Sequence, residues 1–231
     1  MNGRVVVVTG GHKGIGSAVA ARFSAAGDHV VAAGRKECDV TDEAVVAAFF
    51  EGIGRVDVLV NNAGVAASAP LERTSTDEWQ DQLAVNATGA FLCTRAVLPG
   101  MRTRGTGRIV TVASTAGLAG SRSTAGYAAS KHAAVGLMRA VAAEVAGTGV
   151  TANAVCPAFV RTDMTRRSVE RITAATGKAV SEAEAAVAST SPLGRLLEPE
   201  EVAFAVEFLA AAEASAINGQ ALVLDGGGIQ R

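Results

Sequence analysis

A glycine-rich turn near the N-terminus reads Thr9-Gly10-Gly11-His12-Lys13-Gly14-Ile15-Gly16. The strand-like run Arg4–Thr9 precedes it, and a segment of helical character, Gly14–Ala26, follows it. Glycines at such a turn let the backbone approach a pyrophosphate, and the N-terminus of the next helix offers free N–H groups and a positive dipole end. Glycine turns also serve purely structural ends, but a strand before and a helix after favour dinucleotide binding.

The rest of the chain repeats this strand–helix pattern. The expected strands are Arg4–Thr9, His29–Ala33, Val56–Val60, Arg108–Ala113, Val150–Val155 and Ala221–Leu224. The expected helices are Gly14–Ala26, Thr41–Glu51, Thr76–Arg104, Ala125–Ala146 and Pro199–Ala212. Most of the strands are continuous apolar runs, which is typical of strands buried on both faces of a parallel sheet. We therefore predict an α/β fold, a doubly wound parallel sheet with helices on both sides, in a single domain over residues 1–231.

Composition and charge exclude several classes of protein. The 231 residues are 49% hydrophobic and 19% charged, with a net charge of −1. This composition argues against general disorder and against a basic nucleic-acid footprint. The first apolar run, Val5–Val8, is too short for a signal-peptide core, and no stretch reaches the ~20 apolar residues of a membrane span. We expect a cytoplasmic protein with neither a nucleic acid nor a membrane as partner.

The cysteines are an odd and widely spaced set, Cys38, Cys93 and Cys156. Such a set suits buried thiols in a reducing compartment better than a disulfide framework. It also lacks the paired spacing of a zinc site, so we expect no metal.

Residues 161–197 fit the strand–helix pattern least well. They contain two short helical pieces, Arg166–Ala175 and Ser181–Ala188, and follow the carboxyl end of an expected strand. Ligands bind beyond that edge in such folds, so we predict a substrate lid at about 161–197. A simple helical insertion is the alternative.

Tyr127 and Lys131 form the first candidate catalytic pair. Tyr127 is the only tyrosine in the chain, and Lys131 follows it by four residues within an expected helix. Residues i and i+4 are neighbours on one helix face, and a nearby cation favours the phenolate over the phenol. Tyr127 is therefore a credible general acid/base with a lowered pKa. The alternative is an ordinary amphipathic helix with a half-buried Tyr and a solvent-reaching Lys.

Ser114 and Asn86 are two further candidate catalytic residues. Ser114 follows the expected strand Arg108–Ala113 and should lie at the carboxyl edge of the sheet, where its hydroxyl can hold a substrate carbonyl. Asn86 lies within the expected helix Thr76–Arg104, although Asn has a poor helix propensity. Capping of a turn by Ser114 and a solvated face at Asn86 are the alternatives.

The motifs together resemble a known family. The glycine turn has the spacing Thr-Gly-x-x-x-Gly-x-Gly, and Asn61-Asn62-Ala63-Gly64, Asn86, Ser114, Tyr127-x-x-x-Lys131 and Asp225-Gly226-Gly227 follow in order. This combination resembles the short-chain dehydrogenase/reductase family, and in particular its 3-oxoacyl-thioester reductases. The resemblance implies a Rossmann-type dinucleotide-binding catalytic domain that transfers a hydride between a nicotinamide cofactor and a carbonyl or alcohol.

The resemblance also implies roles for the four catalytic residues. Tyr127 would protonate the nascent alkoxide during reduction, while Ser114 would stabilise the same oxygen. Lys131 would lower the phenol pKa and bind the nicotinamide ribose, and Asn86 would kink its helix and hold a water that links Lys131 to solvent. The implied cofactor-binding residues are Gly10, Lys13, Gly14, Ile15, Gly16, Arg35, Asp39, Val40, Asn61, Ala63, Gly64, Tyr127, Lys131, Pro157, Val160 and Thr162.

The end of the second strand bears on the choice of cofactor. NAD sites place an acidic residue there to accept from the ribose 2′-OH, whereas an arginine accommodates a 2′-phosphate. Here Gly34 stands at the acidic position, Arg35 follows it, and Lys13 adds a second cation. These residues favour NADPH over NADH. Alternatively, the cations are ordinary surface charges and Glu37 or Asp39 reaches the ribose.

The same region departs from the family pattern. Only Lys36-Glu37-Cys38 separates Arg35 from the Asp39-Val40 pair that would flank the adenine. A parallel crossover needs about a dozen residues or more, so the helix and strand that normally follow the second strand should be missing or vestigial. We predict about six strands and a thinly enclosed adenine pocket.

A second departure follows the fifth strand. Ala158 stands where the family commonly has glycine, and it is tolerated only if its φ is negative.

The expected function is reduction of a small-molecule carbonyl, possibly thioester-linked, by NADPH. An NAD-dependent alcohol or dihydrodiol dehydrogenase is the alternative, and a non-catalytic nucleotide-binding regulator is a more distant one. The expected helices Thr76–Arg104 and Ala125–Ala146 form subunit interfaces in the family, so the resemblance implies a homotetramer or homodimer.

Overall fold

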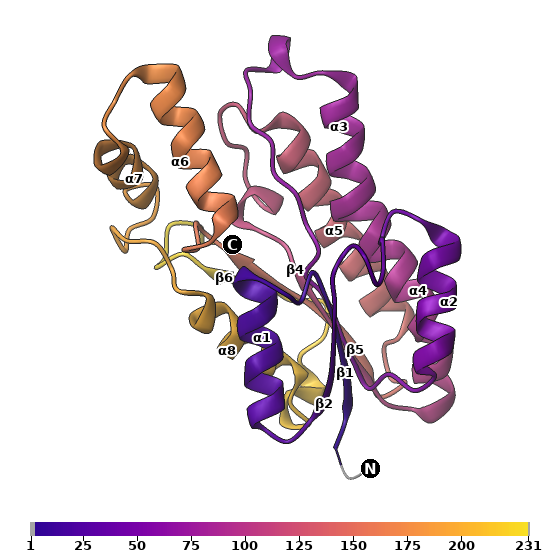
Figure 1. Cartoon of the computed structure of the whole chain (residues 1–231). Coiled ribbons are helices and arrows are strands. Elements are labelled where there is room, and N and C mark those ends of the chain that lie inside the picture. The colour runs from indigo at the N-terminus through magenta and orange to yellow at the C-terminus, as the bar shows by residue number, and fades with distance from the viewer. Residues whose placement is uncertain (1–2, 231) are drawn as a thin grey trace.

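The core of the molecule is a parallel sheet that runs through the middle of the computed structural model, which describes residues 3–230 (Figure 1). Within these residues the sheet has six strands in the order β2-β1-β3-β4-β5-β6. Their bounds are β1 Val5–Thr9, β2 His29–Ala33, β3 Val58–Asn61, β4 Gly107–Val112, β5 Val150–Pro157 and β6 Ala221–Leu224. Every neighbouring pair is parallel, so all six carboxyl ends meet at one edge.

Helices cover both faces of this sheet. Their bounds are α1 Gly14–Ala25, α2 Glu43–Ile53, α3 Thr76–Leu83, α4 Gly89–Arg104, α5 Ala125–Glu144, α6 Asp163–Thr176, α7 Val180–Ala188 and α8 Pro199–Ala210. Helices α1 and α8 pack together on one face, and α2, α4 and α5 cover the other (Figure 1). The predicted α/β fold with a doubly wound parallel sheet is confirmed.

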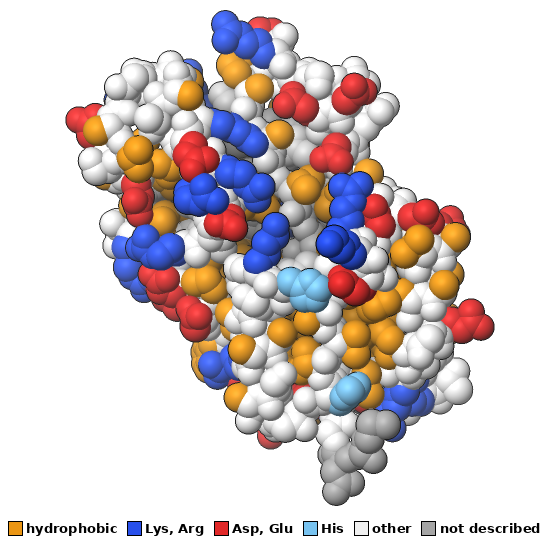
Figure 2. Space-filling view, in the orientation of Figure 1, with side chains coloured by type: hydrophobic (Ala, Val, Ile, Leu, Met, Phe, Trp, Pro, Cys, Tyr) orange, Lys and Arg blue, Asp and Glu red, His pale blue; other side chains and the backbone are white. Residues whose placement is uncertain are grey.

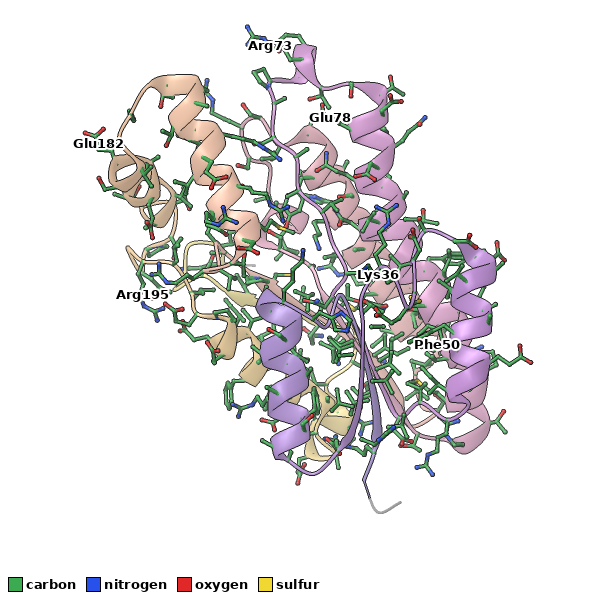
Figure 3. The ribbon with its side chains drawn as sticks, viewed as in Figure 1. Lys36, Phe50, Arg73, Glu78, Glu182 and Arg195 are labelled. Atoms are coloured by element: carbon green, nitrogen blue, oxygen red, sulfur yellow. The ribbon has the colours of Figure 1, made fainter. Side chains whose placement is uncertain are left out.

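Alternate residues of each central strand feed opposite cores. Val6 and Val8 of β1 belong to the same core cluster as Phe23 of α1. Val7 between them belongs to the opposite cluster, with Met101 of α4 and Phe50 of α2; Phe50 is labelled in Figure 3. All three valines are fully buried. Continuous apolar runs are what a strand covered on both faces requires.

The connection after β2 is as short as the sequence indicates. Residues 34–42 lead from β2 directly into α2, and β2 forms an edge of the sheet. The predicted loss of a helix and a strand here is confirmed. The connection is anchored through Val40, because a Cβ on Gly89 of α4 would lie only 2.7 Å from the Val40 Cγ2. Glycine at position 89 thus lets α4 approach this short connection closely.

The predicted helix Thr76–Arg104 is interrupted. It consists of α3 and α4 joined by a π-helical turn, η2, over Ala84–Thr88, with Asn86 at its centre. The Gly89 N–H donates to the Ala84 carbonyl, which inserts one extra residue into the turn. Such π turns occur frequently at functional sites.

Helices α6 and α7 stand apart from the sheet, at its carboxyl edge (Figure 1). They share a small apolar cluster of their own, made of Val169, Ala183, Val187 and Leu196. A single bridge between Val160 and Leu197 joins the two ends of this segment. None of the helices in residues 3–230 combines the length and the apolar character that a membrane crossing requires.

Candidate active site

The glycine turn adopts a conformation that only glycine takes easily. Gly10 and Gly14 have φ values of 63° and 54°, and a Cβ on Gly16 would lie 2.3 Å from the Gly10 carbonyl oxygen. Lys13 begins α1 without a side-chain cap, and the first turn of α1 holds no acidic residue. The turn is therefore an open cradle of backbone N–H groups at a helix N-terminus, which fits a dinucleotide pyrophosphate.

Two side chains tie this turn to the end of β3. The Thr9 hydroxyl accepts from the N–H groups of Asn62 and Ala63, both at 3.1 Å. The Asn62 amide in return donates to the carbonyls of Thr9 and Gly10 at 2.9 and 3.1 Å. The motifs that contain Thr9 and Asn62 do not reveal this clamp, because it depends on β1 and β3 being neighbours in the sheet.

Asn61 lies at the same edge of the sheet, but its side chain contacts α4 instead of the glycine turn. Its buried amide donates to the Thr94 hydroxyl of α4 at 3.0 Å. Its Oδ1 has no hydrogen-bond partner among the described residues, and it lines a small cavity together with Thr111 and Lys131. A polar cavity of this kind suits a buried water.

Lys131 is anchored beneath the candidate general acid. Its ammonium donates to the Val112 carbonyl of β4 at 2.9 Å and lies 5.8 Å from the centre of the Tyr127 ring. The side chain is 5% exposed, and this burial lowers the pKa of Lys131 to about 8. The expected placement of both side chains on one helix face is present.

Ser114 is a neighbour of the phenol. It follows β4, and its hydroxyl accepts from the Ala116 N–H at 3.1 Å. Burial raises the pKa of Tyr127 above its ordinary value, and the hydrogen bond with Ser114 opposes that shift. Sequence reasoning predicted a lowered pKa for this phenol. The direction differs because the loss of solvent outweighs the favourable contact.

Asn86 connects three elements of the site. Its Oδ1 accepts from the Val65 N–H, and its Nδ2 donates to the Val65 carbonyl and the Ser130 hydroxyl, each at 2.9 Å. A Cβ on Gly64 would lie 3.1 Å from the Asn86 Oδ1 and 3.6 Å from the Lys131 Nζ. Asn86 therefore holds the chain after β3 against α5, beside the buried amine.

The expected adenine side carries an exposed ion pair and a buried valine. Arg35 is paired with Asp39 through Nε and Oδ2 at 3.0 Å, and its side chain is 84% exposed. The Thr41 hydroxyl and N–H hold Asp39 on its other oxygen, and they lower its pKa. Val40 is buried. Lys and Arg side chains gather across this face above the strands (Figure 2).

The segment after β5 reaches the glycine turn. A Cβ on Gly14 would lie 3.1 Å from the Thr162 Cγ2, so the start of α6 stands over the start of α1. Pro157 ends β5 and Val160 is buried. Among residues 3–230, Ser123 is the only non-glycine with a positive φ, so Ala158 is unstrained. The Ala158 N–H donates to the Leu224 carbonyl at 3.0 Å.

The fold thus brings most of the expected residues to one edge. Gly10, Ala63, Gly64, Asn86 and Lys131 are close neighbours through the contacts given above. Ile15 differs, because its partly buried side chain packs into the core beneath α1. No group of three His, Cys, Asp or Glu side chains in residues 3–230 is arranged to hold a metal ion.

Comparisons with known proteins agree with this architecture. A family model described as enoyl-(acyl carrier protein) reductase matches residues 36–228. The chain is similar to the 3-oxoacyl-[acyl-carrier-protein] reductase FabG of Vibrio cholerae, with 36% identity over 98% of both chains.

Solved structures show the same similarity. A variant of actinorhodin polyketide ketoreductase with NADPH has a TM-score of 0.87 and 36% identity, covering 98% of this chain and 97% of its own. A Beutenbergia cavernae protein described as an NAD(P)-dependent gluconate 5-dehydrogenase, with bound NADP at low occupancy, has a TM-score of 0.86 and 40% identity. That similarity covers 97% of this chain and 96% of the other.

Proposed function

Because the chain belongs to the short-chain dehydrogenase/reductase family, we propose that it is an NADPH-dependent reductase of a small-molecule carbonyl, most like a 3-oxoacyl thioester. The observation that carries this proposal is the small cavity at the sheet edge that Asn86 and Lys131 line together with Thr9. Tyr127 lies beside the Lys131 ammonium, and Ser114 follows β4 at the same edge. The similarity to FabG and to an NADPH-bound polyketide ketoreductase supports the choice of substrate class and cofactor.

The cofactor would lie across the carboxyl ends of the strands. Backbone groups of the turn at Gly10, Gly14, Ile15 and Gly16 would receive the pyrophosphate. Lys13 and Arg35 would face the 2′-phosphate, while Asp39 and Val40 would flank the adenine. The remaining cofactor contacts would come from Asn61, Ala63, Gly64, Tyr127, Lys131, Pro157, Val160 and Thr162.

The proposed reduction requires a hydride and a proton, which come from different groups. NADPH supplies the hydride when it is bound. Ser114 donates a hydrogen bond to the substrate oxygen, and Tyr127 gives that oxygen its proton. General acid catalysis of this kind contributes roughly 10²- to 10⁴-fold.

Lys131 and Asn86 would help to return a proton to the Tyr127 phenol. The buried amine of Lys131 has a pKa of about 8, so it exchanges a proton readily near neutral pH. The small polar cavity that it shares with Asn86 suits a water through which the proton of Tyr127 is replaced from solvent.

The segment 161–197 is proposed as a lid over the substrate. It begins beside the glycine turn at Thr162, and α6 and α7 have their own apolar cluster instead of packing on the sheet. Two arginines near its start are already paired, Arg161 with Glu184 and Glu198, and Arg166 with Asp163 and Glu170. We therefore assign substrate selectivity to the apolar lining of the lid, such as the exposed Leu193.

We further propose a cytoplasmic homotetramer or homodimer that pairs through the helices around α4 and α5. The exposed aromatic side chains of Trp79 and Phe91 on α3 and α4 support an interface there.

The second candidate function is oxidation of an alcohol or diol with NAD. The similarity to a protein described as an NAD(P)-dependent gluconate 5-dehydrogenase favours the oxidation, and the choice of NAD rests on Glu37 or Asp39 reaching the ribose.

The test is a set of absorbance assays at 340 nm. Acetoacetyl-CoA with NADPH is expected to be turned over faster than crotonyl-CoA, which offers a double bond instead of a ketone. The reverse direction is assayed with an alcohol and diol panel and NAD⁺. Turnover only in that direction would replace the first candidate with the second, and no turnover in any arm would remove both.

A further inference from the structure

The short connection after β2 carries an acidic side chain to which the proposed NADPH-dependent reduction assigns no role. Glu37 lies three residues beyond Gly34, and its Oε2 accepts a hydrogen bond from the Gly34 N–H at 2.9 Å. A Cβ built on Gly34 would lie 2.8 Å from the His12 Nδ1 and 3.2 Å from that Glu37 oxygen. The His12 ring and the Glu37 carboxylate therefore share the space into which a side chain at position 34 would extend.

This position has a defined meaning in dinucleotide sites. A carboxylate at the end of the second strand accepts a hydrogen bond from the ribose 2′-OH of NAD. Gly34 has no side chain to do so, but Glu37 brings a carboxylate to the same place from farther along the chain. Glu37 can reach back to Gly34 because it lies in the short connection between β2 and α2.

The surroundings keep this carboxylate ionised and within reach. The His12 Nδ1 lies 3.9 Å from the Glu37 Oε2, and the two side chains are 54% and 48% exposed. Hydrogen bonds to backbone N–H groups, first that of Gly34, lower the pKa of Glu37 below its ordinary value. Lys36, the residue before it, is labelled in Figure 3 on the face that carries the glycine turn.

We propose that Glu37 is a specificity-determining residue for the cofactor. Its carboxylate accepts from the 2′-OH of NADH and repels the 2′-phosphate of NADPH. Lys13 and Arg35 favour NADPH, and Glu37 opposes them. The preference of the protein for NADPH over NADH is therefore smaller than it would be without Glu37. This inference rests on the proposed function, since it requires that the cleft bind a dinucleotide.

Binding of adenosine fragments tests the proposal without catalysis. The dissociation constants of adenosine 2′,5′-bisphosphate and 5′-AMP are measured by calorimetry for the wild type, Glu37→Gln and Glu37→Ala. Glu51→Gln is the matched control, because Glu51 is an exposed glutamate on α2 that loses the same charge. A charge at ~4 Å in water changes affinity about 5-fold, so both Glu37 variants should bind the bisphosphate at least that much more tightly. Glu51→Gln should stay within twofold of the wild type.

Kinetics supply the second arm. The ratio of kcat/KM for NADPH to that for NADH is expected to rise about 10-fold in Glu37→Ala, since the 2′-OH also loses its acceptor. Equal effects of the Glu37 and Glu51 substitutions, or an unchanged bisphosphate-to-AMP ratio, would overturn the assignment while leaving the reductase intact. A wild type that binds neither fragment and reduces no carbonyl would instead overturn the proposed function, and this inference with it.

Discussion

The ammonium of Lys131 on α5 donates a hydrogen bond to the carbonyl of Val112 on β4, at 2.9 Å. This contact holds the amine under the Tyr127 ring, 5.8 Å from its centre, and away from bulk water. The charged form pays for that burial, so the pKa of Lys131 falls to about 8. Burial thus gives the site an amine whose pKa lies close to neutral pH.

Replacing Lys131 with Met should make stability less dependent on pH. The ordinary lysine pKa is 10.5 and that of Lys131 is about 8, so between these values the unfolded chain binds more protons than the folded one. Stability of the wild type therefore rises with pH across this window. Relative to Lys131→Met, it should gain about 2 kcal/mol between pH 7 and 9.5.

Urea unfolding at pH 7, 8 and 9.5 measures this gain. Lys178→Met removes an exposed lysine and should run parallel to the wild type. If Lys131→Met also runs parallel to the wild type, the pKa of Lys131 is the same in the folded and the unfolded chain, and burial does not lower it.

Tyr127→Phe should remove most of the turnover. Phenylalanine keeps the ring but cannot give a proton to the substrate oxygen, so kcat should fall roughly 10²- to 10⁴-fold. The dissociation constant of NADPH should change much less, because the glycine turn is untouched. Retention of most of the wild-type kcat would show that another group supplies the proton.

Thr9→Val should loosen the glycine turn. The substitution is close in shape, but it leaves the N–H groups of Asn62 and Ala63 without their acceptor. The free energy of unfolding should fall by about 1–3 kcal/mol, and NADPH should bind more weakly. Thr9→Ser keeps the hydroxyl and should preserve both quantities. A Thr9→Val variant as stable as the wild type, with unchanged NADPH binding, would show that this hydroxyl does not support the turn.

Ser75→Ala should affect stability alone. Ser75 caps α3 by accepting from the Glu78 N–H, while the Glu78 carboxylate accepts from the Ser75 N–H. Loss of this cap should lower the free energy of unfolding by about 1 kcal/mol, with kcat/KM unchanged. Ser75→Asp retains a side-chain acceptor and should restore most of the loss. A large fall in kcat/KM would mean that the start of α3 reaches the substrate.

The pattern of apolar residues along the chain was sufficient to predict the strands of the sheet and most of the helices. The runs His29–Ala33 and Ala221–Leu224 are strands with the expected bounds. They form the two edges of the sheet and are only partly buried, and their valine residues favour the strand. The missing helix and strand after β2 followed from chain length, since so few residues cannot make a parallel crossover. The interruption at Asn86 was expected only through resemblance, because a π turn has no hydrophobic period of its own.

The sequence by itself therefore determined the fold class, the family and the edge of the sheet at which the chemistry-bearing residues gather, since these depend on periodicity and order along the chain. Only the tertiary structure decided what those residues do to one another. Burial raises the Tyr127 pKa, Asn62 clamps the glycine turn, and Glu37 reaches the Gly34 N–H. Each of these effects depends on desolvation or on contacts between separate turns and strands. The spacing of residues along the sequence does not encode desolvation or such contacts.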